Sequence, residues 1–147
     1  MMFRFSIVML IVVFTIGCDD EIAPAEIPSV VENTFKSHYP DAVQVEWESY
    51  GKDFEVDFEL DRTDHSARID NAGNLLGYKY EIATNTLPSK IITVLNTEYA
   101  KMKWEDPEIL VTGKKSYYQL EIDGFFNDKK IVLDSTGNEI ENIKHWN

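Results

Sequence analysis

The stretch KDFEVDFELDR, residues 52–62, predicts a β-strand with one apolar side and one acidic side. Side chains on a strand point alternately to its two faces, so residues two apart share a face. The two sets alternate strictly: Phe54, Val56, Phe58 and Leu60 on one side, and Asp53, Glu55, Asp57, Glu59 and Asp61 on the other. The acidic face can stay in water, but the apolar face needs a cover. The rest of the chain has to supply that cover.

The pattern around this strand occurs twice, which predicts two copies of one structural unit. IPSVVENTFKSHYP, which begins at residue 27, matches LPSKIITVLNTEYA, which begins at residue 87. Farther along, IDNAGNLL from residue 69 matches LDSTGNEI from residue 133. The two copies span residues 27–82 and 87–146.

Each copy is expected to begin with a helix and to continue as four strands. A proline favours a helix start because its missing N–H would be unpaired there. The apolar residues after Pro28 and Pro88 then recur every three to four positions. Glycine-containing turns separate the following runs at hairpin spacing. The expected strands cover 43–50, 52–61, 65–70 and 75–82 in the first copy, and 107–112, 116–123, 127–134 and 139–146 in the second.

Two helices can cover only one face of such a sheet. The sequence therefore predicts an α+β fold in which two tandem helix-plus-four-strand units form one antiparallel sheet, with both helices on one face. Trp47 is expected in the core, because it continues the inward parity of Val43 and Val45. The other face is expected to be open to water, and the carboxylates of residues 52–62 should lie on it.

The N-terminus predicts export followed by lipid attachment. An apolar run over residues 5–16 follows the basic Arg4, and it is shorter than the about 20 residues that a bilayer span needs. The stretch TIGC, which ends at Cys18, resembles the lipobox of bacterial lipoproteins, in which the cysteine is lipidated. An ordinary secretory signal with an incidental cysteine is the alternative. We expect a signal peptide over 1–17, a lipidated tether over 18–26 and a single domain over 27–147.

Charge and cysteine content narrow the class of partner. The formal net charge is −12 at pH 7, so nucleic acid and anionic membrane surfaces would repel the chain. Cys18 is the only cysteine, so stability must come from the core rather than from an internal disulfide. The lipid on Cys18 is the expected membrane contact, which places the domain in the cell envelope, either periplasmic or exposed at the surface of the outer membrane.

The order of these elements resembles the PepSY-like family, which is also described as beta-lactamase-inhibitor-like. The matching pieces are Ile27-Pro28, Tyr39-Pro40, Val45-Glu46-Trp47-Glu48, Asp70 to Asn74, Leu87-Pro88 and Asp134 to Asn138. The resemblance covers the chain from residue 27 onward. It implies a small secreted or lipid-anchored envelope protein without catalytic activity. It also implies a use for the open sheet face, because the related beta-lactamase inhibitors bind enzymes through that face.

The sequence offers no recognisable catalytic machinery. It contains no G-x-S-x-G, no H-E-x-x-H and no Gly-rich phosphate loop. His38, His65 and His145 fall in different elements and are interpreted as structural or surface histidines. The DNAGN and DSTGN stretches are interpreted as β-turns, because their spacing differs from that of a calcium loop. We expect no enzyme, no cofactor and no metal site.

The open face is expected to bind a protein or peptide of the envelope, one of cationic character. Carboxylates alone also suit a merely solvated face, but tyrosines on the same face would add aromatic anchors to the charges that steer a partner. The expected contact residues are Glu55, Asp57, Glu59, Arg68, Tyr117, Gln119 and Glu121. The alternative is an envelope lipoprotein that binds a small ligand or a divalent cation along the acidic row.

Overall fold

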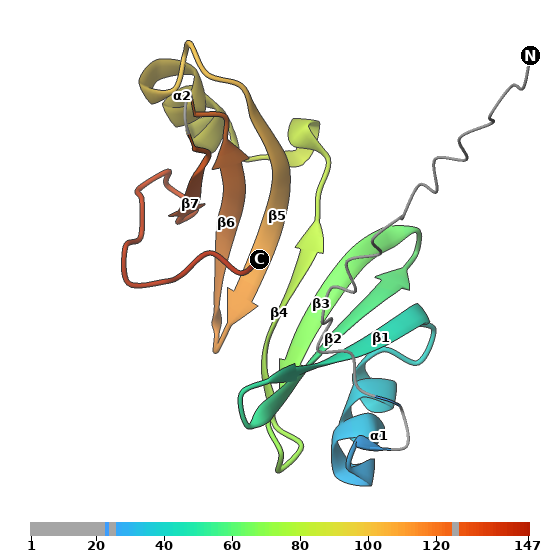
Figure 1. Cartoon of the computed structure of the whole chain (residues 1–147). Coiled ribbons are helices and arrows are strands. Elements are labelled where there is room, and N and C mark those ends of the chain that lie inside the picture. The colour runs from blue at the N-terminus through green and yellow to red at the C-terminus, as the bar shows by residue number, and fades with distance from the viewer. Residues whose placement is uncertain (1–22, 24–25, 125–126) are drawn as a thin grey trace, which may run out of the picture.

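A computed structural model describes residues 23, 26–124 and 127–147, and Cys18 with the expected signal peptide lies outside them. In this part of the chain the strands form a seven-stranded antiparallel sheet, and strands that are neighbours in the sequence are neighbours in the sheet (Figure 1). The strands are β1 Val43–Tyr50, β2 Asp53–Leu60, β3 Thr63–Ile69, β4 Leu75–Glu81, β5 Trp104–Thr112, β6 Lys115–Ile122 and β7 Lys129–Leu133. The helices are α1 Ser29–His38, before β1, and α2 Ser89–Glu98, between β4 and β5, with a short 3-10 helix Thr84–Thr86 before α2.

Both helices begin directly after a proline, as the sequence predicts. Pro28 and Pro88 occupy the N-cap positions with extended backbone, and their carbonyls accept the first helical hydrogen bonds, from Glu32 and Ile92 at 3.1 Å each. A proline at this position loses nothing by lacking an N–H. From residue 27 to 40 and from residue 87 to 100, the two segments carry the same succession of buried, half-buried and exposed positions.

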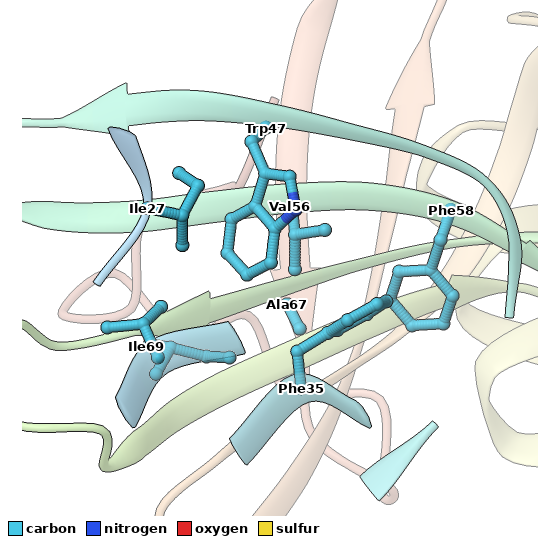
Figure 2. Packing of buried hydrophobic residues seen from close by; sticks show 8 residues of the cluster. Ile27, Phe35, Trp47, Val56, Phe58, Ala67 and Ile69 are labelled. Carbon is cyan, nitrogen blue, oxygen red and sulfur yellow. The ribbon is translucent and has the colours of Figure 1, made fainter. Parts of the chain in front are cut away.

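Helix α1 packs against β1, β2 and β3 and forms the first of two hydrophobic clusters (Figure 2). The Phe35 ring lies edge-on to the rings of Trp47 and Phe58, with centroid distances of 5.4 and 5.1 Å. Val56 and Ile69 are fully buried beside them. Full burial of one such aliphatic side chain contributes about 1.5–3 kcal/mol.

Helix α2 forms the second cluster in the same way. Ile91 and Leu95 are fully buried against Leu120, Ile122 and other residues of β6 and β7. A row of cross-strand partners joins the two clusters across the sheet: Phe58, His65, Tyr80, Ile109 and Tyr118. Both clusters therefore lie on one face. The antiparallel α+β sheet with both helices on the same face is confirmed, while the tandem two-unit arrangement stays a prediction.

The expected eighth strand over 139–146 does not form. After β7, Glu139 makes one isolated bridge to Leu133, and the chain then turns back across the sheet face opposite the helices and ends in front of β5 (Figure 1). We call residues 139–147 the tail and the face under it the tail face. The expectation of an eight-stranded layer is therefore wrong, because the last segment covers the sheet instead of extending it.

A bulge in β1 changes the expected parity of that strand. The register with β2 shifts between Val43 and Glu46, and Gln44 has a left-handed φ of 52°. Such an extra residue bends the strand and reverses the facing of the side chains beyond it. Val43 and Val45 are exposed while Trp47 is buried. Trp47 is a core residue as predicted, but the parity argument that led there is wrong for Val43.

The turn after β7 depends on one carboxylate, which also gives it a pH dependence. The Asp134 Oδ1 accepts hydrogen bonds from the Thr136 hydroxyl at 2.6 Å and from the backbone N–H groups of Thr136 and Asn138 at 2.8 and 3.1 Å. These hydrogen bonds, above all the one from the Thr136 hydroxyl, favour the ionised carboxylate and lower the pKa of Asp134 to about 2.

Because the folded pKa of Asp134 lies below its ordinary value of 3.8, its stabilising effect is present above about pH 4 and disappears as the pH falls through about 2. We expect the free energy of unfolding to fall more steeply between pH 4 and pH 2 for the wild type than for Asp134→Asn, which keeps an acceptor oxygen but cannot titrate. Urea denaturation at a series of pH values measures both slopes. Equal slopes would show that this carboxylate does not stabilise the turn through its charge.

Candidate functional site

The residues predicted to bind a partner all belong to the tail face. A second row of cross-strand partners crosses the sheet from Asp57 through Ser66, Lys79 and Leu110 to Tyr117. Asp57 and Tyr117 therefore lie on the same surface, on strands four positions apart. Alternation along β2, β3 and β6 places the other predicted residues there too: Glu55, Glu59, Arg68, Gln119 and Glu121.

The tail covers the centre of this face, so the expectation of a bare surface is wrong there. Trp146 is 4% exposed and Gln119 is fully buried beneath it. The Trp146 backbone N–H donates to the Gln119 Oε1 at 3.0 Å, and the Gln119 Nε2 donates to the Trp146 carbonyl at 2.7 Å. The Lys79 ammonium donates to the same carbonyl at 3.4 Å. One glutamine side chain therefore holds the backbone of one tail residue on both sides.

A partly buried ion pair holds the indole ring of the same tryptophan. The Arg68 Nε donates to the Glu55 Oε2 at 2.7 Å, and the indole N–H of Trp146 donates to the other carboxylate oxygen, Oε1. The Arg68 guanidinium carbon lies 3.8 Å from the ring centroids of both Tyr50 and Trp146. The Glu55 side chain is 11% exposed. A buried carboxylate needs such partners, so Glu55 and Arg68 hold the tail and are not free for a partner.

Beside this centre the acidic row remains accessible. A surface pocket of about 360 Å³ lies over β1 to β5 on the tail face. We call it the acidic pocket, after its carboxylates Glu46, Asp57, Glu59, Asp64, Glu81 and Glu108. Lys79 lies in it and pairs with Glu108 at 3.1 Å, and Gln44 donates to Glu59 at 2.8 Å. Partial burial, followed by the charges of Asp64 and Glu108, raises the pKa of Glu81 above its ordinary value.

The remaining predicted residues lie along the path of the tail. Tyr117 is half-buried and lines a pocket together with Ile140 and Asn142 of the tail. Glu121 pairs with Lys130 at 2.9 Å, and the Lys130 ammonium also donates to the Asn147 Oδ1 at 2.9 Å. The structure therefore separates the seven predicted residues into two groups: Asp57 and Glu59 line the acidic pocket, and the others contact the tail directly or lie in its surroundings.

Trp146 is the residue that the sequence argument missed at this site. The sequence analysis predicts an eighth strand over residues 139–146, but Ile140, Ile143 and Trp146 recur every third residue, which is not the alternation of a strand. These three residues are buried or half-buried in the structure. The spacing was therefore a signal against an eighth strand.

The three histidines lie on different elements: His38 on α1, His65 on β3 and His145 in the tail. His38 contacts the Thr34 carbonyl at 3.0 Å, and the His65 ring stacks between Phe58 and Tyr80. His145 is half-buried in the tail, and burial together with the nearby charge of Lys130 lowers its pKa. Within residues 23, 26–124 and 127–147, no group of three or more His, Cys, Asp or Glu is placed to hold a metal ion. In the same ranges, neither helix has the length and apolarity to cross a bilayer.

Charge reversal should separate the two groups of acidic residues. We expect Glu55→Lys to lower the free energy of unfolding by about 3 kcal/mol or more, because it buries a second cation against Arg68 and removes the indole acceptor. We expect Asp57→Lys to change it by no more than about 0.5 kcal/mol, since this change leaves the buried centre intact and relieves repulsion from its cross-strand neighbour Glu46. Urea denaturation of the two variants tests this contrast. An equal decrease in the free energy of unfolding of both variants would show that Glu55 and Asp57 contribute to stability in the same way.

No family model matches the sequence, and no curated protein matches it. Solved structures from Bacteroides do match the fold. A candidate periplasmic protein of Bacteroides eggerthii is 12% identical with a TM-score of 0.72, over 78% of this chain and 86% of that one. A BLIP-like protein of Bacteroides fragilis is 18% identical with a TM-score of 0.68, over 81% of this chain and 92% of that one. A DUF2874 family protein of Bacteroides uniformis is 18% identical with a TM-score of 0.72, over 78% of this chain and 86% of that one. The chain therefore has a BLIP-like fold, in line with the beta-lactamase-inhibitor-like resemblance of its sequence.

Proposed function

We propose that the chain is a non-catalytic, lipid-anchored protein of the cell envelope that binds a protein or peptide through the tail face. The observation that carries this proposal is that the tail face already binds a polypeptide segment, the tail of the same chain. Gln119 bonds both the N–H and the C=O of Trp146, so it holds main chain in the manner of a neighbouring strand. A surface that binds its own tail in this way has the groups that bind an extended segment of another protein.

The acidic pocket supports a cationic partner. Its six carboxylates lie around a single ammonium group, that of Lys79, which Glu108 already pairs. Burial first, and then repulsion from neighbouring carboxylates such as Asp64 and Glu108, raises the pKa of Glu81 above its ordinary value. A lysine or arginine from a partner would relieve that repulsion, and opposite charge would also speed the encounter. A cluster of carboxylates is by itself typical of many solvated faces. Here the cluster lies next to Gln119, which binds the backbone of a polypeptide segment.

The envelope location is supported by the N-terminal sequence. The apolar run before Gly17 and Cys18 has the length of a signal segment and ends in the small residue and cysteine of a lipobox-like site. The similar protein of Bacteroides eggerthii is described as a candidate periplasmic protein. We also propose that the two halves of the sheet are copies of one unit. The matching burial of residues 27–40 and 87–100 supports this proposal.

An inhibitory role follows if the partner is an enzyme, because occupation of the enzyme surface would block its substrate. The similar Bacteroides fragilis protein is BLIP-like by name, and the sequence of our chain lacks the motifs of the common hydrolases. The alternative ligand is a small molecule or a divalent cation. The acidic pocket concentrates carboxylates, but among the described residues no group of three or more is placed to hold an ion. Calcium titration separates the two candidates. An ion that binds the folded chain raises the unfolding temperature with concentration, whereas a surface for proteins responds little.

A double charge reversal in the acidic pocket should abolish capture of a cationic partner. We expect Asp57→Lys with Glu59→Lys to weaken binding of a lysine-rich peptide at least about tenfold, which corresponds to about 1.4 kcal/mol. Fluorescence anisotropy at physiological salt measures the dissociation constant, with residues 23–147 as the soluble protein.

The matched control is Asp41→Lys with Glu98→Lys, which makes the same change in net charge at two exposed positions outside the pocket. We expect this control to retain binding within about threefold, because screening limits the effect of distant charges. If both double variants lose binding equally, attraction by net charge explains the result and the acidic pocket is not a binding site.

A further inference from the structure

The surroundings of Trp146 have the composition of a ligand site rather than of a packed core. We propose that Tyr50, Glu55, Arg68 and Gln119 form a slot that recognises a tryptophan within a peptide, and that the tail occupies this slot from within the same chain. The ligand class is a peptide or protein segment that presents a tryptophan in extended conformation. This inference concerns other residues than the acidic pocket and does not require that a partner binds there.

The slot recognises the indole ring through two different properties. The Glu55 Oε1 accepts the indole N–H, and the Arg68 guanidinium lies 3.8 Å from the ring centroid. Tryptophan gives the strongest cation–π contact of the aromatic residues. A phenylalanine would leave the buried carboxylate without one of its donors, which is costly. The slot therefore favours tryptophan over other aromatic side chains.

The strand below provides a flat floor for the ring. Gly77 of β4 is buried under Trp146, and a Cβ atom built there would come within 3.7 Å of the indole ring and 2.7 Å of the Val111 carbonyl. A larger residue at this position would displace backbone. The distance of 3.7 Å to the indole ring is ordinary van der Waals contact, so it is the close approach of the Val111 carbonyl that requires glycine at this position.

The backbone contacts of the slot do not depend on the sequence around the tryptophan. Gln119 donates to the carbonyl and accepts from the N–H of the same residue. Its amide group also donates to Glu108, which Lys79 holds at 3.1 Å. The hydrogen bond to Glu108 does not involve the tail, so it can orient the Gln119 amide before a ligand arrives. Such fixed donors and acceptors reduce the entropy cost of binding.

Beyond Ile140, the tail is attached to the sheet mainly through Trp146, with a further hydrogen bond from Lys130 to Asn147 at 2.9 Å. Its backbone joins β7 through the Glu139 bridge and the bond from the Ile140 N–H to the Val132 carbonyl at 2.8 Å. Residues 141–147 form no helix or strand, and most of them are exposed. The tail also fills its side of the face incompletely. A cavity of about 320 Å³ remains beside Trp146, between the tail and the side chains of Leu76 and Leu110.

That cavity offers space to residues that flank the tryptophan of another segment. It lies within the range of about 300–1,000 Å³ that ligand sites occupy. A tethered occupant has a local concentration in the millimolar range, so a free peptide must compete against it. The full chain is therefore expected to bind such a peptide only weakly until its own tryptophan is removed.

Peptide binding in trans tests the slot. The protein is residues 23–147 with Trp146→Ala, and the probe is a fluorescent peptide of the tail sequence EIENIKHWN. We expect the variant to bind this probe at least about tenfold more tightly than the wild type does, as measured by fluorescence anisotropy. Matched peptides with phenylalanine or alanine in place of the tryptophan should bind progressively less. Gln119→Ala, added to Trp146→Ala, should weaken the binding of all three peptides to a similar extent, because Gln119 contacts only the main chain of the bound residue.

The folded state of the Trp146 variants has to be established before their peptide binding is compared. Circular dichroism and thermal unfolding establish whether Trp146→Ala is folded, and Trp146→Phe serves as the milder variant, because it retains a ring but no indole N–H. If a folded variant binds the tryptophan and alanine peptides equally, the slot recognises no tryptophan and the inference is wrong. If both variants are unfolded, Trp146 is an integral part of the fold, which also overturns the inference. Neither result bears on the acidic pocket, whose test uses other substitutions.

Discussion

The fold depends on the burial of one apolar sheet face under two short helices. Each helix has ten residues, which is too short for stability in water without tertiary contacts. The strands in turn expose a continuous apolar face if nothing covers them. Phe35 and Leu95 join the two layers, because each is buried in the middle of its cluster. Helices and sheet therefore stabilise each other, and neither layer is expected to persist alone.

This constraint leaves the opposite face to polar chemistry, and the tail gives that face two distinct environments. Glu55 and Asp57 are two residues apart on β2 and point the same way. Glu55 lies under the tail and is paired on both oxygens, whereas Asp57 lines the acidic pocket. Like charges along one strand are therefore tolerable here for two different reasons. Glu55 is neutralised by the half-buried Arg68, and Asp57 stays partly solvated.

Much of the fold could be predicted from local pattern, because alternation and helical periodicity depend on neighbours in the sequence. The β2 pattern and the prolines before both helices located the sheet and its cover. The β1 bulge could not be predicted in this way, since Gln44 adopts a left-handed φ that its residue type does not signal. The tail was also mispredicted. Its position is set by contacts such as that between Glu55 and Trp146, which are 91 residues apart in the sequence.

Sequence alternation placed the predicted site residues on the correct face of the sheet. The same local pattern could not show which of them the tail would bury. Parity determines the face, but a distant segment determines burial. Polar residues on a solvated face need no specific partner, whereas Glu55, Arg68 and Gln119 form a connected set of hydrogen bonds around one side chain. Replacing a buried ion pair by apolar residues of similar volume often leaves stability unchanged or improves it. Stability alone therefore does not require this arrangement. What the polar groups add is selectivity, because a carboxylate facing an indole N–H and an amide facing main chain accept one residue type in one orientation.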